Sequence, residues 1–189
     1  MGDFKINEKS VITQSGSAEP VLASNVNLGS ATFPAGHVIQ VKSFTKTDTA
    51  STTHDESAAP VTTGLTVTLN NNLSSASNKV LIFINVGGIG QQYGTGATFL
   101  ILDGVTSTAT GDAATGEEVT MAVNSRGSDG YNIKSASMCF EDSPATVTPQ
   151  AYTLMFHGSG GTNYINRAYS VDANSGNTIS TITAMEIQV

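Results

Sequence analysis

Short runs in which aliphatic residues alternate with hydroxyl-bearing residues recur along this chain. One run consists of three aliphatic residues separated by threonines: Leu65, Thr66, Val67, Thr68 and Leu69. Because successive side chains of a β-strand point to opposite faces, this alternation places the aliphatic residues on one face and the threonines on the other. The run is therefore expected to form a strand with one buried face.

The run at residues 79–86 (KVLIFINV) is almost continuously apolar and rich in branched aliphatic residues. Its shortness, and the glycines Gly87 and Gly88 directly after it, favour a strand over a helix. Because apolar side chains would point to both sides of such a strand, we expect it to be buried on both faces and central in a sheet.

Similar short runs occur along the rest of the chain, at residues 37–44, 97–102, 118–123, 136–140, 151–157, 164–171 and 178–189. Residues with turn chemistry, mainly Gly, Asn, Asp and Ser, separate many of these runs. The pattern predicts about nine strands, and no segment has convincing helical periodicity with caps. We therefore predict an all-β fold, an antiparallel β-sandwich resembling a jelly roll.

Residues 1–36 differ from the rest of the chain, because their aliphatic residues are sparse among Ser, Asn, Gly and Pro. So few apolar side chains cannot form a core of their own. We expect an extended N-terminal arm that lies on neighbouring copies of the chain, as in subunit exchange, or on a larger assembly. Residues 37–189 are then one β-sandwich head domain, since a sandwich of this length normally folds as a single unit.

The 189 residues carry a net charge of −7, and the eight Lys and Arg residues are scattered without forming a stripe. A protein that binds phosphate backbones needs such a stripe, so nucleic acid is not an expected partner. An acidic surface also attracts anionic membranes little. The longest apolar stretch, residues 80–86, is far shorter than the roughly 20 residues of a spanning helix. We therefore expect no membrane partner.

The first four residues (MGDF) lack the basic and apolar stretches of a secretory signal, so synthesis in a cytoplasm is expected. The only cysteine, Cys139, excludes an intramolecular disulfide and cannot alone supply a cysteine-rich metal site. Because Cys139 lies in an apolar run, we expect a buried and inert thiol.

Two glycine-rich stretches match known motifs only in part. Gly87, Gly88 and Gly90 follow a predicted strand, as in a dinucleotide-binding loop. However, Tyr93 occupies the position of the third motif glycine and no helix follows, so we predict an ordinary loop there. The stretch at residues 158–161 (GSGG) lacks the strand-turn-helix context of a nucleophile elbow. Neither stretch predicts a cofactor or a nucleophile.

Titratable residues form no pattern typical of metal binding or catalysis. His37, His54 and His157 have none of the close spacings of a metal site. Residues 172–176 (DANSG) contain part of a calcium loop but lack its other ligands, so a turn is expected. The adjacent glutamates at 117–118 would point to opposite faces of a strand. The sequence thus predicts no catalytic residue, no metal and no cofactor, and hence no enzyme.

Four predicted loops are rich in Gly, Ser, Asn and Tyr, which make adaptable polar contacts with ligands such as sugars. These loops are residues 87–96, 109–116, 124–132 and 158–163. The candidate receptor-contact residues within them are Tyr93, Asn124, Tyr131, Asn132 and Asn163. The two tyrosines could stack on sugar rings where they are exposed.

Five segments are similar to known sequences: 33–41 (FPAGHVIQV), 77–81 (SNKVL), 141–144 (EDSP), 164–167 (YINR) and 180–187 (STITAMEI). In their order and spacing they resemble segments that recur in virion structural proteins of marine and cyanobacterial bacteriophages, including fibre-tip domains. The resemblance covers residues 33–189. It implies a β-sandwich head, a homotrimer of the kind that phage fibre heads form, and a preceding virion-attachment segment, and it brings no catalytic residues.

Together, these observations predict a bacteriophage virion surface protein, made in the cytoplasm of the bacterial host, that acts as a short trimeric fibre or spike. Residues 1–36 would contact other virion proteins, and the head loops would contact host surface polysaccharide. The alternative is a capsid decoration protein without receptor binding. Two further classes stay open, a carbohydrate depolymerase with carboxylates from different strands and a secreted carbohydrate-binding module. The absent signal peptide argues against the second.

Overall fold

The computed structural model describes residues 4–6, 9–13, 15–16, 18, 21–22, 34–53, 59–92, 97–106, 122–124, 131, 133–158, 160–172 and 176–189. Of these, residues 4–6, 22 and 122–124 are described by their backbone alone. The chain divides into two compact units, Met1–Phe33 and Pro34–Val189. All regular elements in the described ranges are strands.

The first unit contains a three-stranded antiparallel sheet with the order β1 (Phe4–Ile6), β2 (Lys9–Thr13) and β3 (Val21–Leu22). The sequence did not predict these short strands. Ile12 and Val21 keep 38% and 59% of their surface exposed. The role of this segment as an arm stays a prediction.

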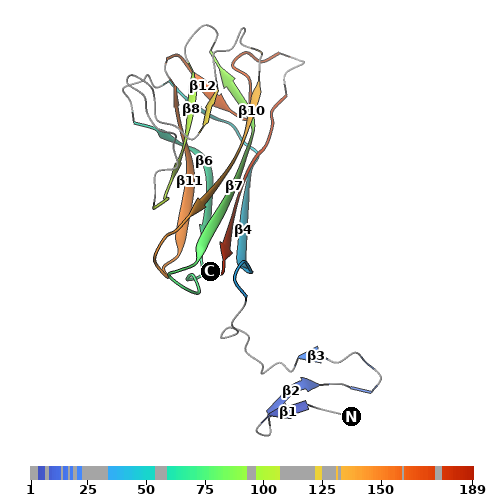
Figure 1. Cartoon of the computed structure of the whole chain (residues 1–189). Coiled ribbons are helices and arrows are strands. Elements are labelled where there is room, and N and C mark those ends of the chain that lie inside the picture. Colours follow the sequence, from blue (N-terminus) through green and yellow to red (C-terminus); the bar gives the residue numbers. More distant parts are fainter. Residues whose placement is uncertain are drawn as a thin grey trace. The chain divides into compact units, whose positions relative to one another are not determined.

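The second unit contains two antiparallel sheets (Figure 1). The larger sheet has the order β4 (Val38–Lys46), β13 (Ser180–Ile187), β7 (Lys79–Gln91), β12 (Asn163–Ile165) and β5 (Ala50–Thr52), with β10 (Lys134–Asp142) also paired to β7. The smaller sheet has the order β6 (Val61–Leu69), β11 (Gln150–Gly158), β8 (Thr98–Asp103) and β9 (Ala122–Asn124). The predicted all-β fold with antiparallel sheets is confirmed.

The core lies between the two sheets and explains why these runs form strands. In β6, Leu65, Val67 and Leu69 are buried while the threonines between them lie on the other face, as the alternation predicted. They belong to one apolar cluster with residues of β7 such as Ile82 and Ile84. Burying one such side chain stabilises a fold by roughly 2 kcal/mol. This shared core is consistent with a β-sandwich.

Strand β7 is central, as predicted, but it is not buried on both faces. Val80, Ile82 and Ile84 point into the core, whereas Phe83 keeps 42% of its surface exposed and Asn85 is exposed. Among the described residues, only the face of β7 that meets the smaller sheet is covered. No described segment packs over Phe83 on the other face. The prediction of burial on both faces is therefore wrong for the single chain.

The loop predicted at residues 87–90 is also wrong, because β7 continues through these glycines to Gln91. Other segments of the chain cross this part of the strand very closely. A Cβ atom at Gly87 would lie 2.1 Å from the carbonyl oxygen of Ile179, and one at Gly90 would lie 2.2 Å from that of Arg167. Glycine in a strand often marks such a close approach of another backbone.

The strand predicted at residues 164–171 is much shorter in the structure. Strand β12 ends at Ile165, and Asn166 has a φ of 66°. Asn tolerates this left-handed conformation better than most residues, and the conformation stops the extended run. The strand predicted at residues 118–123 is described only from Ala122 onward, in β9.

Candidate functional site

Three of the five predicted receptor-contact residues lie within the part of the chain that the structure describes. Tyr93 and Asn132 lie outside the described residues. Asn124 is the last residue of β9 and pairs with Thr98 of β8. Tyr131 lies in a turn with 58% of its surface exposed, so it is accessible to a ligand. The loop at residues 109–116 lies wholly outside the described residues, and so does most of the loop at 124–132.

Asn163 requires a correction, because it lies in β12 rather than in an exposed loop. Its side chain has no exposed surface, and its Oδ1 accepts a hydrogen bond from Thr98 Oγ1 at 2.6 Å. It also packs on Gly158, where a Cβ atom would lie 1.9 Å from Asn163 Nδ2. The amide therefore joins two strands of different sheets and is not available to a receptor.

The titratable residues give no metal centre within the described ranges, where no group of three or more His, Cys, Asp and Glu side chains could hold an ion. His37 is exposed, and His54 lies outside the described residues. His157 is buried, with its ring centroid 5.0 Å from that of Phe99. The predicted turn at residues 172–176 and the glutamates at 117–118 fall largely or wholly outside the described residues.

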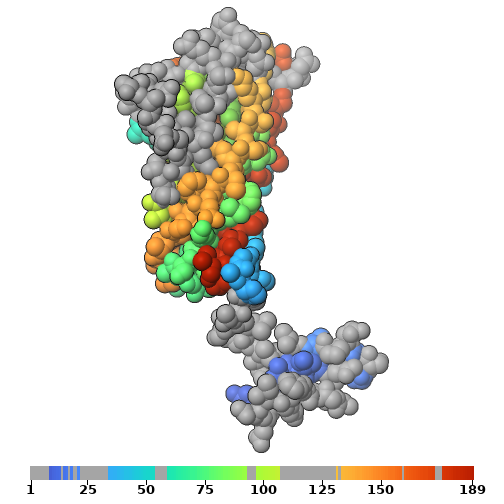
Figure 2. Space-filling model, in the orientation of Figure 1, coloured from blue at the N-terminus to red at the C-terminus, as the bar shows by residue number. Residues whose placement is uncertain are grey.

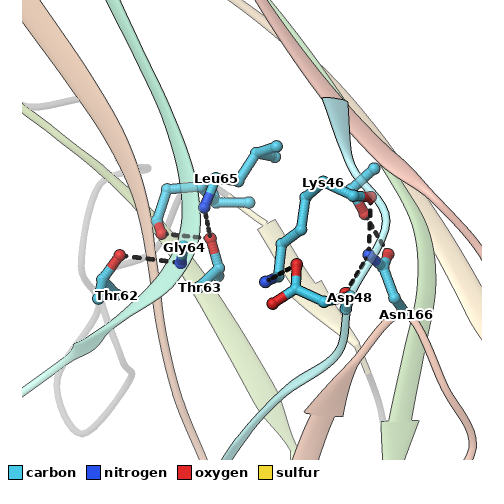
Figure 3. A network of polar contacts seen from close by, with 9 residues as sticks. Lys46, Asp48, Thr62, Thr63, Gly64, Leu65 and Asn166 are labelled. Atoms are coloured by element: carbon cyan, nitrogen blue, oxygen red, sulfur yellow. Dashed lines mark hydrogen bonds and ion pairs between the residues drawn. The ribbon is translucent and has the colours of Figure 1, made fainter. Parts of the chain in front are cut away.

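A buried polar network joins β4, the segment after it and the end of β12 (Figure 3). Asn166 Nδ2 donates to the carbonyl oxygens of Lys46 at 3.1 Å and of Asp48 at 2.9 Å. Its Oδ1 accepts a hydrogen bond from Ser180 Oγ at 2.6 Å. The side chain of Asn166 thus joins the segment after β4 to the start of β13, which is a structural role.

Lys46 extends from this network toward a bulge in β6 (Figure 3). Its side chain is 5% exposed, and its Nζ lies 2.7 Å from Oδ1 of Asp48. The hydrogen bond from Lys46 lowers the pKa of Asp48 below its ordinary value. Gly64 in the bulge has a φ of 79° and leaves room for the ammonium group, since a Cβ there would lie 3.1 Å from Nζ. The buried ammonium group of Lys46 thus has a carboxylate partner, although Asp48 itself is 77% exposed.

Two carboxylates with no exposed surface anchor loops to the sheets. Glu186 accepts hydrogen bonds from Ser74 N at 2.6 Å, Asn78 Nδ2 at 2.6 Å and Gln40 Nε2 at 2.8 Å. Burial acts to raise the pKa of Glu186, but these hydrogen bonds outweigh it and the pKa lies below its ordinary value. Glu186 therefore stays ionised and holds the β6–β7 connection.

The second of these carboxylates, Asp142, is hydrogen bonded to Tyr152 and Thr106. Tyr152 Oη donates to its Oδ2 at 3.0 Å, and the amide of Thr106 donates to its Oδ1 at 2.8 Å. Burial, followed by the charge of Asp142 and the hydrogen bond to it, raises the pKa of the Tyr152 phenol. The phenol thus remains a donor. Neither carboxylate is accessible to a substrate, so neither has the surroundings of a catalytic acid or base.

A depression of about 410 Å³ lies between β5 and the start of β6. Its lining consists of hydroxyl-bearing residues and one valine: Ser51, Thr52, Thr53, Val61 and Thr62. These groups can exchange hydrogen bonds with a polar ligand such as a sugar, but they include no acid–base pair. Sequence reasoning missed this depression, for which the hydroxyl-rich stretches at 51–53 and 61–63 were the only signal.

An aromatic and cationic cluster lies around the end of β12. The guanidinium carbon of Arg167 lies 4.5 Å from the ring centroid of Tyr164, and the rings of Tyr164 and Tyr169 are 5.9 Å apart. Arg167 also donates to the carbonyl oxygens of Ala168 and Tyr169. These partners fold the cluster onto itself, so it stabilises the turn after β12.

The larger sheet presents one broad surface away from the core, which we call the outer face. Residues in register across β10, β7, β13 and β4 form three of its rows: Glu141, Leu81, Met185 and Val41; Cys139, Phe83, Thr183 and Ser43; Ser137, Asn85, Thr181 and Thr45. A fourth row contains Lys79, Ile187 and Val38. Figure 2 shows the atoms of β10 in gold at the surface of the head.

The outer face combines apolar and hydroxyl-bearing side chains. Val38, Val41 and Phe83 are 42%, 48% and 42% exposed. Cys139 is exposed there as well, which overturns the predicted buried thiol. Its neighbours in β10 pack against the core, and a residue one position away in a strand must point to the opposite side.

The fold and these sites define the chain as an all-β protein with antiparallel sheets. In comparisons with known proteins, no protein-family model and no curated protein sequence matches it. Within the described residues, no helix is long and apolar enough to cross a membrane.

Proposed function

We propose that this chain is a bacteriophage virion surface structural protein that forms a short trimeric fibre or spike. In this proposal, residues 1–36 attach to other virion proteins and the head meets host surface polysaccharide. The observation that carries the proposal is the outer face, where exposed apolar side chains such as Phe83 and Val41 form a flat surface with little charge. Such a surface is typical of subunits that complete their burial by association.

We infer further that the head is a jelly roll. When the short strands β5 and β12 are left out, the head strands in chain order are β4, β6, β7, β8, β9, β10, β11 and β13. The larger sheet then contains the first, eighth, third and sixth of them, and the smaller sheet contains the second, seventh, fourth and fifth. This order is that of two Greek keys wrapped into a sandwich, an architecture common in viral capsid and lectin domains.

Support for sugar recognition comes from the described surface. Tyr131 is exposed in a turn, and the depression beside β5 presents several hydroxyl groups. Aromatic rings and hydroxyl groups are suited to saccharides because they offer stacking and hydrogen bonds together. A fibre with several copies of a weak site would gain from avidity.

The first test is the oligomeric state of the purified full chain, measured by size-exclusion chromatography with light scattering. We expect a trimer, and a monomer at micromolar concentration would contradict the proposal. Electron microscopy of the intact particle, with an antibody against the head, would then locate the protein. Label at the tail supports a fibre or spike, whereas label spread over the capsid favours the decoration protein.

Glycan-array binding tests the receptor role separately. We expect binding to host polysaccharide that is weakened by Tyr131→Ala and kept by Val147→Ala, since Val147 is exposed but lies outside the predicted contact loops. If the wild-type trimer binds no host glycan, the receptor role is wrong and the decoration alternative is favoured.

A further inference from the structure

We infer that the outer face of the larger sheet is the surface through which copies of this chain contact one another. The inference rests on the proposed multimer and assigns its interface. Large exposed apolar side chains distinguish this face from its counterpart on the smaller sheet. Val38, Val41 and Phe83 belong to the outer face, whereas none of the exposed large apolar side chains described in the head belongs to β6, β8 or β11.

Four polar side chains of the outer face already have partners on that face. Ser43 and Thr183 share a hydrogen bond of 2.7 Å, and Ser137 Oγ donates to Asn85 Oδ1 at 3.0 Å. A buried polar group costs free energy chiefly when it lacks a partner. These four groups can therefore lose their water at low cost, which suits this part of the face to a protein partner.

The charges of the chain favour a second copy as that partner. The whole chain has a net charge of −7, so two copies repel each other in most orientations. On the outer face the charged residues are Lys79 and Glu141, which form an ion pair with each other. The face is thus neutral overall. Two negatively charged copies can therefore bring their outer faces together without repulsion between like charges.

The size of the outer face also fits a subunit contact. Four strands spaced by about 4.8 Å and rows about 7 Å apart give a flat area of about 500 Å². This is of the same order as the roughly 800 Å² of accessible surface that each partner buries in a stable interface. A face covered by protruding side chains has more accessible surface than its flat area.

Cys139 provides a direct test because it is the only thiol of the chain and lies beside Phe83 in the register of β10 and β7. We expect a fluorescent maleimide to label Cys139 at least about tenfold more slowly in the native oligomer than in a dissociated chain. In the oligomer the thiol can react only when the interface opens. Labelling should accelerate as the protein is diluted below its dissociation concentration.

Two outer-face variants, Phe83→Lys and Ser137→Lys, and one matched control, Thr68→Lys, complete the design. Thr68 is an exposed strand residue on the smaller sheet. We expect both outer-face variants to be monomers with rapid Cys139 labelling and a wild-type circular-dichroism spectrum, and the control to remain an oligomer with slow labelling. Ser137 keeps the test valid if Phe83→Lys does not fold, since its side chain is exposed in β10.

The possible failures are distinguishable. A wild-type oligomer whose Cys139 is labelled rapidly, or that survives both substitutions with Cys139 still protected, would overturn the assigned interface and leave the multimer standing. A wild-type monomer would overturn the proposed multimer itself, and the interface with it.

Discussion

Glu186 is a carboxylate without exposed surface whose described hydrogen-bond partners are all neutral. Such a group stabilises the fold only while it is ionised and all its donors are satisfied. Its neighbours Gln40, Ser74 and Asn78 come from β4 and from the β6–β7 connection. A single side chain thus joins three segments that are far apart in the sequence.

Replacing Glu186 by Gln is expected to lower the free energy of unfolding at pH 7 by about 2 kcal/mol, since hydrogen bonds to a charged acceptor are lost. The folded pKa of Glu186 lies below its unfolded value, so its contribution is full above the ordinary pKa of a glutamate and disappears as pH falls through the folded pKa. The difference between wild type and variant should therefore shrink on acidification. Urea unfolding at pH 7 and at lower pH values measures this.

Glu141→Gln is the matched control, because Glu141 pairs with Lys79 at the surface. We expect a change of about 0.5 kcal/mol or less from it. If the two variants behave alike at pH 7, the role assigned to Glu186 is wrong. At the residue level the sequence held few clues: a glutamate in an alternating strand looks exposed, and only the fold shows which loop closes over it.

Among elements, β7 shows how far the alternation of residues predicts structure. The central strand at residues 79–86 and the half-buried strand at residues 65–69 both followed from the sequence pattern. The continuation of β7 through its glycines did not follow, because it depends on the segment that contains Arg167 and Ile179 crossing the strand. The predictions for Asn163 and Cys139 were wrong for a related reason. The sequence shows neither which segment packs against a strand nor which face of that strand is covered.

Gly90→Ala is expected to destabilise the head by about 3 kcal/mol, because the new Cβ would overlap backbone atoms that cannot easily move. It would lie 2.2 Å from the carbonyl oxygen of Arg167 and 2.8 Å from Cα of Ala168. Gly176→Ala is the control, since no atom lies within 4 Å of its Cβ position. Thermal unfolding followed by circular dichroism compares them, and equal midpoints would contradict the close packing at Gly90.

For the whole molecule, the apolar core cluster lies entirely within Pro34–Val189. The head should therefore fold without the first 33 residues. We expect the truncated chain to keep its β-type circular-dichroism spectrum and a melting temperature within about 3 °C of the full chain. A fall of more than about 10 °C would show that the N-terminal unit contributes to the stability of the head.

Composition and alternation were sufficient to predict an all-β, antiparallel architecture for the whole molecule. Composition and alternation could not predict the candidate interface. An apolar run such as residues 79–86 fits a strand buried on both faces, but it also fits a strand that its own chain covers on one face only, with Phe83 on the uncovered face. The exposed fraction of Phe83 distinguishes these possibilities only once the second sheet is placed on the other side.

The near absence of charge on the outer face has a thermal consequence. Contacts that depend on removing apolar surface from water weaken on cooling, whereas contacts between ions respond mainly to salt. Copies joined through Phe83 and Val41 would therefore hold together more firmly in a warm sample than in a chilled one. Cold storage would then favour dissociated copies.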